Sequence, residues 1–277
     1  MDQVSPRQIF LTGTLPPTRE DEFKSKLRLM NEPLQIIRNK CTRDNLKYDY
    51  INMDPDLQCP ELVYDMAEQA KKQGRRAIIF VLSKVECEDL SHKMNIPKYY
   101  SGLPQVELTA AIDTWKADKG AIVATTAMAQ GVDHDASLVL CLRAYDMMTM
   151  CQQFGRAGRD GTPASVMLIA PLSSLRDDIK TFATSVCKRS AVSTYLDGVP
   201  ERCGFHHNLC NGCLGLEVKV DRSGNPVQVA RDQNLQPRRF ISSLASDTGT
   251  TAPPFPRTPT NSKPSRQGSL SSTIGLE

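Results

Sequence analysis

The sequence predicts an α/β fold, in which a parallel sheet is covered by helices on both faces and is followed by a small helical, cysteine-rich module and a polar tail. Short uninterrupted apolar runs recur along the chain, and such runs are typical of strands buried on both faces of a parallel sheet. These runs alternate with segments of helical pattern, as parallel strands joined by helical crossovers require. The length of 277 residues allows one large domain or two small ones.

The elements follow one another in a regular order. A strand expected over 4–11 is ended by the Thr-Gly-Thr-Leu-Pro-Pro sequence of 12–17. A helix is expected over 18–29, with Thr18 as its N-cap and acidic residues in its first turn, and 32–53 should be extended. Four buried strands are then expected at 77–82, 121–125, 138–142 and 164–169. Four helices are expected at 60–74, 86–94, 106–116 and 147–154.

The last part of the chain differs in composition. Residues 173–196 have a helical pattern and carry Cys187, and the Cys- and His-rich stretch 203–213 follows. From 217 onward the chain is rich in Pro, Ser and Thr and poor in aromatic residues. Because such a segment offers little apolar surface for a core, it is predicted to be a disordered tail.

Composition argues against several classes of protein. The chain carries 34 basic and 31 acidic side chains, and the excess of +3 lies within 221–277. The neutral balance of 1–220 argues against a purely electrostatic binder of nucleic acid. We expect no membrane span, because no apolar run approaches about 18 residues, and no signal peptide. Nine cysteines in such a chain favour thiols or metal ligands over a disulfide scaffold.

One segment is more informative than the rest: the ten residues 152–161, which read Q-Q-F-G-R-A-G-R-D-G. Its glycines permit close approach and positive φ, and the forks of Arg156 and Arg159 match phosphate oxygens. For an isolated R-x-x-R, a Gly-rich loop with solvated arginines is the simpler interpretation. The whole string favours phosphate recognition.

This string resembles motif VI of superfamily 2 helicases, in the form found in the RecQ family. Other segments resemble further motifs of that family in the expected order, over roughly 4–213. They are 12–14 (motif III), 43–48 (the connector into the second motor domain), 78–83 (motif IV), 100–103 (a Y-H-A-G-L-like turn) and 123–133 (motif V).

The resemblance implies the second RecA-like domain of a 3′–5′ DNA helicase, which hydrolyses ATP with Mg²⁺ in a cleft between two such domains. Arg156 and Arg159 match the arginines that reach the γ-phosphate, with Arg159 as the arginine finger. Positive charge there stabilises the transferring phosphoryl group. Gln152, Gly131 and Asp133 match further nucleotide-binding positions of motifs V and VI.

The resemblance also implies contacts to single-stranded or junction DNA. Hydroxyls and backbone amides that contact phosphates fix the register without reading the sequence. The expected positions are Ser83, Ser101, Gly102, Thr125 and Thr126. A few such groups suit a domain that has no net charge.

A complete motor of this class also needs a P-loop and an acidic motif that holds Mg²⁺. The chain contains no Gly-Lys dipeptide, and its Asp-Glu pair at 21–22 is expected in a solvated helical turn. We therefore expect the C-terminal half of a motor, inactive alone, that works in the nucleus with a separate P-loop-bearing half. The alternatives are a non-catalytic, zinc-stabilised nucleic-acid-binding remnant and a regulatory partner of an intact helicase.

The expected domains follow from these assignments. They are 1–44 (end of the first RecA-like domain and connector), 45–171 (second RecA-like domain), 172–216 (helical zinc-binding module) and 217–277 (disordered tail).

Four cysteines have the spacing of a structural zinc site: Cys187, Cys203, Cys210 and Cys213. Four thiolates around a tetrahedral Zn²⁺ form a common structural site, and the C-x2-C pair places two ligands on one turn. The six residues between Cys203 and Cys210 also leave a ligand set with one histidine, or no metal, as alternatives; the histidines concerned are His206 and His207. The stretch 187–198 resembles the C-R-R-x-x-L-x-x-Y-x-G sequence of the RecQ zinc module, with its first cysteine on a helix.

Overall fold

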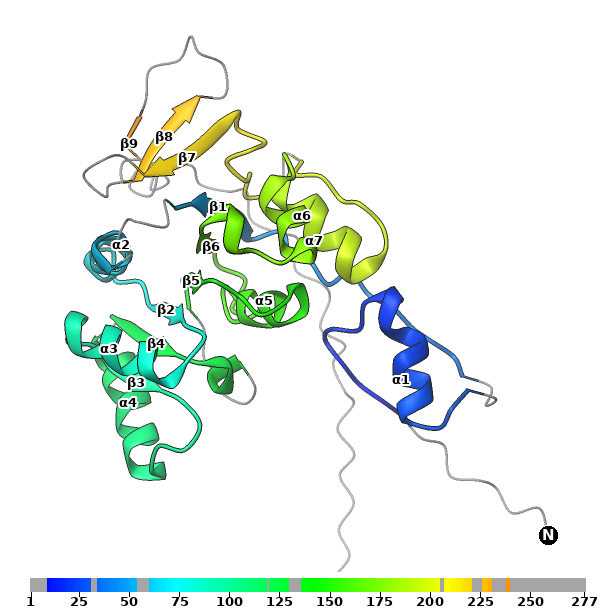
Figure 1. Cartoon of the computed structure of the whole chain (residues 1–277), viewed down its shortest axis with the longest axis horizontal. Coiled ribbons are helices and arrows are strands. Elements are labelled where there is room, and N and C mark those ends of the chain that lie inside the picture. Colours follow the sequence, from blue (N-terminus) through cyan, green and yellow to red (C-terminus); the bar gives the residue numbers. More distant parts are fainter. Residues whose placement is uncertain are drawn as a thin grey trace, which may run out of the picture.

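The computed structural model describes residues 9–30, 34–53, 60–118, 120–129, 136–204, 207–220, 226–230 and 238–239. Within these residues, the strands form one sheet in the order β3-β4-β2-β5-β6-β1-β7-β8-β9 (Figure 1). The strands are β1 Leu46–Asn52, β2 Ala77–Phe80, β3 Lys98–Tyr99, β4 Ala121–Ala124, β5 Leu138–Leu142, β6 Ala164–Ala170, β7 Leu216–Val220, β8 Pro226–Ala230 and β9 Arg238–Arg239. The α-helices are α1 Glu20–Lys26, α2 Pro60–Lys72, α3 Lys84–Met94, α4 Gln105–Asp118, α5 Met147–Phe154, α6 Asp177–Thr184 and α7 Lys188–Asp197. The 3-10 turns are η1 Pro17–Arg19, η2 Thr126–Ala129 and η3 Leu172–Ser174.

The strands from β3 to β1 pair in parallel. Strand β7 joins the edge of β1 in parallel at a single pair, Asn52 with Lys219. The strands β7, β8 and β9 then pair antiparallel. The predicted parallel sheet is therefore confirmed, and it is extended at one edge by a small antiparallel ribbon.

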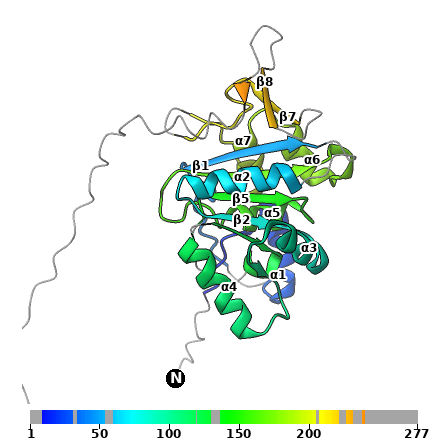
Figure 2. The ribbon, with the colours of Figure 1, turned by 90° about the vertical axis from the view of Figure 1, so that its left-hand side faces the viewer.

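Helices cover both faces of this sheet. Along β2, Ile78 and Phe80 enter a core with residues of α4, α5, α6 and α7, whereas Ile79 enters a second core with residues of α2 and α3. Side chains of a strand alternate between its faces, so these two cores lie on opposite sides of the sheet. Figure 2 looks onto α2, which lies along the sheet. The predicted layers are confirmed, and none of the described helices combines the length and apolar character needed to cross a membrane.

The four predicted buried strands and four predicted helices between 60 and 169 all form, with ends shifted by up to two residues. Two expectations before β1 were wrong. Residues 9–11 lie in no strand, because a strand needs a paired neighbour to satisfy its backbone; residues 4–8 lie outside the described part. The helix expected over 18–29 is a 3-10 turn starting at Pro17, followed by the short α1, whose C-terminal turn has Arg28 at a φ of 59°.

The helix expected over 173–196 is divided into α6 and α7. The break lies at Ser185–Cys187, where the Lys188 Nζ donates to the carbonyls of Ala183 and Ser185, both at 2.6 Å. Cys187 is therefore the N-cap of α7 in extended backbone rather than a residue on the helix. This conformation lets its sulfur point toward the later cysteines.

The onset of the tail at 217 was also predicted too early. Residues 216–220 and 226–230 form β7 and β8. In sequence, Leu216, Val218 and Val220 alternate with Glu217 and Lys219, which is the period of a strand. The free edge of β1 supplies a pairing partner. Most of the predicted tail lies outside the described residues.

Candidate nucleotide site and cysteine cluster

The arginine segment forms a loop that follows α5 directly. Asp146 is the N-cap of α5, and its carboxylate accepts the amide of Thr149 at 2.7 Å. After the helix, residues 155–162 turn back toward β6, and a bridge between Ala136 and Ala157 fixes the turn. We call residues 155–162 the arginine loop. Arg156 is half-buried in it and Arg159 is exposed.

Gly158 is required by the geometry of this loop. Its φ is 57°, a left-handed conformation that L side chains rarely adopt. A Cβ at this position would come within 2.5 Å of the Asn45 Nδ2 and 3.0 Å of the Thr162 carbonyl oxygen. The glycine therefore serves both the turn and the close approach of the segment that precedes β1.

A pocket of about 400 Å³ opens beside the arginine loop. Its described lining includes Arg43, Arg156 and Arg159 and contains no acidic side chain. Gln152 also lines it and donates from Nε2 to the Thr14 Oγ1 at 3.2 Å. The structure thus brings together the segments that resemble motifs III and VI. An arginine-rich lining is suited to an anionic ligand; Gly131 and Asp133 lie outside the described residues.

Arg43 and Asn45 contact the arginine loop from the segment before β1, and our sequence prediction gave neither residue a role. The Arg43 NH2 donates to the Gly155 carbonyl at 3.0 Å. The Asn45 Nδ2 donates to the carbonyls of Gly158 and Thr162, both at 2.7 Å. The available signal was their place in the segment 43–48, which resembles the connector of the helicase family.

The positions expected to face DNA lie near the carboxyl ends of β2, β3 and β4. Ser83 is the N-cap of α3, so its hydroxyl oxygen already accepts the Glu86 amide at 3.1 Å. Thr125 is buried, and its amide donates to the Tyr99 carbonyl at 3.1 Å, while Thr126 begins η2.

The remaining two positions, Ser101 and Gly102, are exposed. A Cβ on Gly102 would lie 3.2 Å from the Lys84 Nζ, and this ammonium lies 5.6 Å from the centroid of the Tyr100 ring. The sequence prediction missed Lys84, which adds a cation and an aromatic contact to this edge.

The four cysteines of the predicted zinc site, Cys187, Cys203, Cys210 and Cys213, form one cluster. All four sulfur atoms lie within 4.8 Å of one another. The sulfurs of Cys187 and Cys203 are 3.7 Å apart. Four sulfurs at the usual distance from a tetrahedral Zn²⁺ are separated by about 3.8 Å. The donor set and its spacing therefore fit zinc.

The backbone around this cluster is closely packed. A Cβ on Gly212 would overlap the carbonyl of Val186, which precedes Cys187. Burial, together with the neighbouring thiols, raises the pKa of Cys213 to about 12. Removing protons from several adjacent thiols is thus costly without a cation, and a metal ion would supply that charge.

His207 is directed away from the sulfurs. Its Nδ1 accepts the Gly204 amide at 2.7 Å, and its Nε2 lies 3.2 Å from the Asp44 Oδ1 and 3.5 Å from the Glu201 Oε1. The Lys40 ammonium contacts the same two carboxylates. Hydrogen bonding to Lys40 lowers the pKa of Asp44. These four residues form a salt-bridged group, and His206 lies outside the described residues.

Comparisons with known proteins show what this chain is similar to. A protein-family model described as the helicase conserved C-terminal domain matches residues 58–161. The chain is also 25% identical to rat ATP-dependent DNA helicase Q5 in an alignment of 261 residues that covers 77% of this chain. It is 29% identical to the RecQ-like DNA helicase blm-1 of Caenorhabditis elegans in an alignment of 187 residues that covers 62% of this chain.

Residues 58–161 therefore match a helicase C-terminal domain, and the chain is similar in sequence to RecQ-like DNA helicases. It spans about a quarter of the length of the helicase Q5 relative (26%) and 17% of blm-1. Among solved structures, S. cerevisiae Dbp5 bound to RNA and ADP BeF3 matches with a TM-score of 0.48 at 18% identity, over 58% of this chain and 44% of that chain.

Proposed function

We propose that this chain is the C-terminal motor half of a RecQ-like 3′–5′ DNA helicase and supplies the arginines for ATP hydrolysis. The observation that carries the proposal is the arginine-lined pocket, where Arg156 and Arg159 face a segment that includes Thr14. Guanidinium groups at such a site stabilise the charge that develops on a transferring phosphoryl group. Gln152 would help to place the nucleotide.

The P-loop and the acidic Mg²⁺ motif must come from residues outside these 277, because the sequence contains no Gly-Lys dipeptide. An apolar surface supports docking of such a half. Ile9, Leu11 and Ile37 are each more than four-fifths exposed, and all belong to the segment around α1, which Figure 1 shows standing apart from the sheet. These exposed apolar side chains would be covered if such a half docked against the segment. This chain alone would bind nucleotide weakly and would not hydrolyse it.

DNA is the proposed nucleic acid, and the nucleus the proposed location. The edge with Ser83, Ser101 and Gly102 would contact the backbone of single-stranded or junction DNA, and Lys84 would add a phosphate contact. The amides near Thr125 and Thr126 would line the same edge. The four cysteines would hold a structural Zn²⁺, which folds the module and supplies no catalytic group.

Hydrolysis in single-turnover conditions tests the proposal. The chain is mixed with ATP, Mg²⁺ and single-stranded DNA, first alone and then with a RecQ-like P-loop domain supplied separately or joined to its N-terminus. We expect hydrolysis only when the P-loop domain is present. Hydrolysis by the chain alone would contradict the proposal.

The same measurement separates the alternatives. A remnant that only binds nucleic acid would retain DNA affinity and give no hydrolysis in either arrangement. A regulatory partner would change the rate of an intact RecQ-like helicase without complementing an isolated P-loop domain. The arginine-lined pocket favours the motor half over both.

A further inference from the structure

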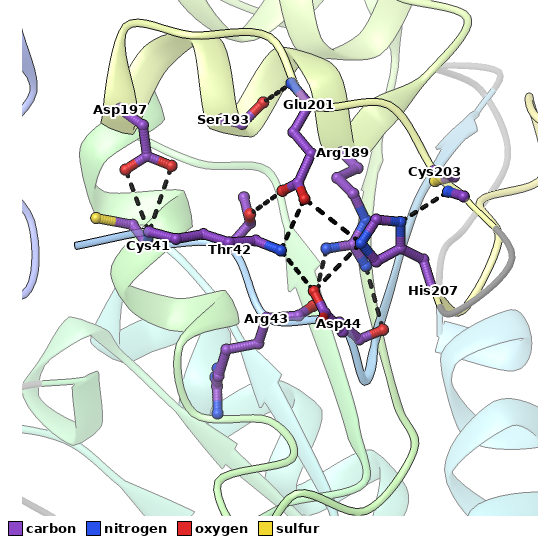
Figure 3. A network of polar contacts seen from close by, with 12 residues as sticks. Cys41, Thr42, Arg43, Asp44, Arg189, Ser193, Asp197, Glu201, Cys203 and His207 are labelled. Atoms are coloured by element: carbon purple, nitrogen blue, oxygen red, sulfur yellow. Dashed lines mark hydrogen bonds and ion pairs between the residues drawn. The ribbon is translucent and has the colours of Figure 1, made fainter. Parts of the chain in front are cut away.

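The segment that leads into β1 lies between the arginine loop and the cysteine module. From here on we call residues 40–46, which overlap the motif-like segment 43–48, the connector. Figure 3 shows it beside α7 and the loop that carries Glu201 and Cys203. Its backbone and side chains contact both neighbours, although these are more than 100 residues away in sequence.

On one side, the connector holds the arginine loop by side-chain bonds to backbone carbonyls. Asn45 bonds the carbonyls at 158 and 162, so one amide spans the part of the loop that follows the Gly158 turn. Arg43 donates to the Gly155 carbonyl at 3.0 Å, and the Nε of Arg159 donates to the same oxygen at 3.2 Å. The Arg159 guanidinium group is thus bonded to the same carbonyl that Arg43 of the connector contacts.

On the other side, α7 holds the connector through Arg189, whose side chain is fully buried. Its NH1 donates to the Arg43 carbonyl at 2.9 Å, and its NH2 donates to the Leu46 carbonyl at 2.8 Å and the Asp44 carbonyl at 3.4 Å. A planar fork can bind several carbonyls at once, which an ammonium group cannot do in the same fixed geometry. Arg189 lies two residues after Cys187. The first turn of α7 therefore carries both a member of the cysteine cluster and the arginine that bonds the connector.

The loop between Cys203 and Cys210 adds further bonds. The Asn208 Nδ2 donates to the Asn45 carbonyl at 2.7 Å. From the residues just before that loop, the Glu201 Oε2 accepts the Thr42 hydroxyl at 2.8 Å. The Cys41 amide donates to the Asp197 carboxylate at the end of α7. The connector is therefore fixed along most of its length by residues of the cysteine module.

We propose that Asn45 and Arg43 are positioning residues for the arginine loop, and that Arg189 of the cysteine module holds them in place. The cysteine module then contributes to nucleotide sensing through the connector, without touching the nucleotide. The link is the set of hydrogen bonds from Arg189 through the connector to the arginine loop, and it depends on those bonds alone. Its effect on nucleotide sensing rests on the proposed role of Arg159.

Hydrogen exchange of the full zinc-loaded chain tests the link. The variants are Asn45→Ala and Arg189→Lys, and Asn39→Ala is the matched control, because Asn39 is an exposed residue just before the connector. We expect the amides of 156–161 to exchange about three- to tenfold faster for each hydrogen bond lost. Amides of β2 and β5 should be unchanged in all variants, and the control should match the wild type.

Affinities for ATP and ADP provide the second readout. Because Arg159 is proposed to meet the γ-phosphate, both variants should lose the preference for ATP over ADP while ADP binding persists. A purely structural defect would weaken both nucleotides alike.

The outcomes separate the link from the proposed function. If neither variant changes exchange in the arginine loop, or if β2 and β5 loosen to the same extent, the link is refuted. If the loop responds but the wild type binds no nucleotide even when a RecQ-like P-loop domain is supplied, the link stands and the proposed function fails.

Discussion

At the scale of single residues, Gly158 lets the Asn45 side chain approach the backbone of the arginine loop closely. Gly158→Ala places a Cβ against the Asn45 amide at a φ of 57°, so it should cost about 1–3 kcal/mol of unfolding free energy. Gly161→Ala is the control, because Gly161 has a φ of 81° and a Cβ added there would meet no atom within 4 Å. Chemical denaturation measures both. We expect Gly158→Ala to lose more unfolding free energy than Gly161→Ala. An equal loss would show that the strain of the positive φ explains the effect without the contact to Asn45.

A second residue, Asp49, makes a prediction about pH. Its carboxylate is buried in β1 and accepts the Asn211 amide at 2.7 Å. Burial raises the pKa of Asp49 above its ordinary value of about 3.9. The folded state thus retains a proton that the unfolded state has lost, so this group's contribution to stability falls as the pH rises between the two pKa values.

Asp49→Asn removes this titration and keeps an acceptor for the Asn211 amide. Relative to the wild type, the variant should gain stability as the pH rises from about 3 to 7. Denaturation curves at several pH values give the difference. If the variant instead loses stability relative to the wild type as the pH rises, the attraction of Lys47, 3.5 Å from the carboxylate, has a larger effect on the pKa of Asp49 than burial has.

At the scale of elements, the cysteine module should depend on its metal. We expect about one Zn²⁺ per chain by metal analysis, and chelation should unfold 185–213 and loosen the connector. Cys213→Ser should lose the metal, whereas Cys41→Ser, a half-buried thiol outside the cluster, should keep it. A metal-free chain with an equally protected α7 would contradict the zinc assignment.

The sequence predicted most strands of the sheet, because a buried strand can be recognised from a continuous apolar run such as 138–142. It failed where a distant residue or a side-chain bond to the backbone decides. At the break before α7, the Lys188 side chain bonds two carbonyls. Strand β7 pairs with β8 at five positions and with β1 at one.

The candidate site shows the same division. The sequence singled out Arg156, Arg159 and the four cysteines by residue type and spacing, and the structure places the two arginines in one pocket and the four sulfurs in one cluster. It gave no role to Asn45 or Arg189, because their partners are backbone carbonyls more than 100 residues away.

At the scale of the whole molecule, the sheet and its helices carry the arginine-lined pocket. The cysteine module bonds the connector, which contacts the arginine loop of that pocket. The described lining of the pocket supplies cations and no carboxylate. In the proposed function, a complementary half would bind Mg²⁺ and cradle the phosphates beside this surface. The exposed apolar side chains of the α1 segment would give that half a place to dock.

The most direct test of this account is single-turnover ATP hydrolysis by the chain complemented with a RecQ-like P-loop domain, compared with its Arg159→Ala variant. The control is Arg176→Ala, an exposed arginine at the start of α6. Loss of an arginine finger should slow hydrolysis by about 10³-fold or more, and the control should leave the rate unchanged. Equal rates for Arg159→Ala and the wild type would contradict the central claim that this chain supplies the arginine for hydrolysis.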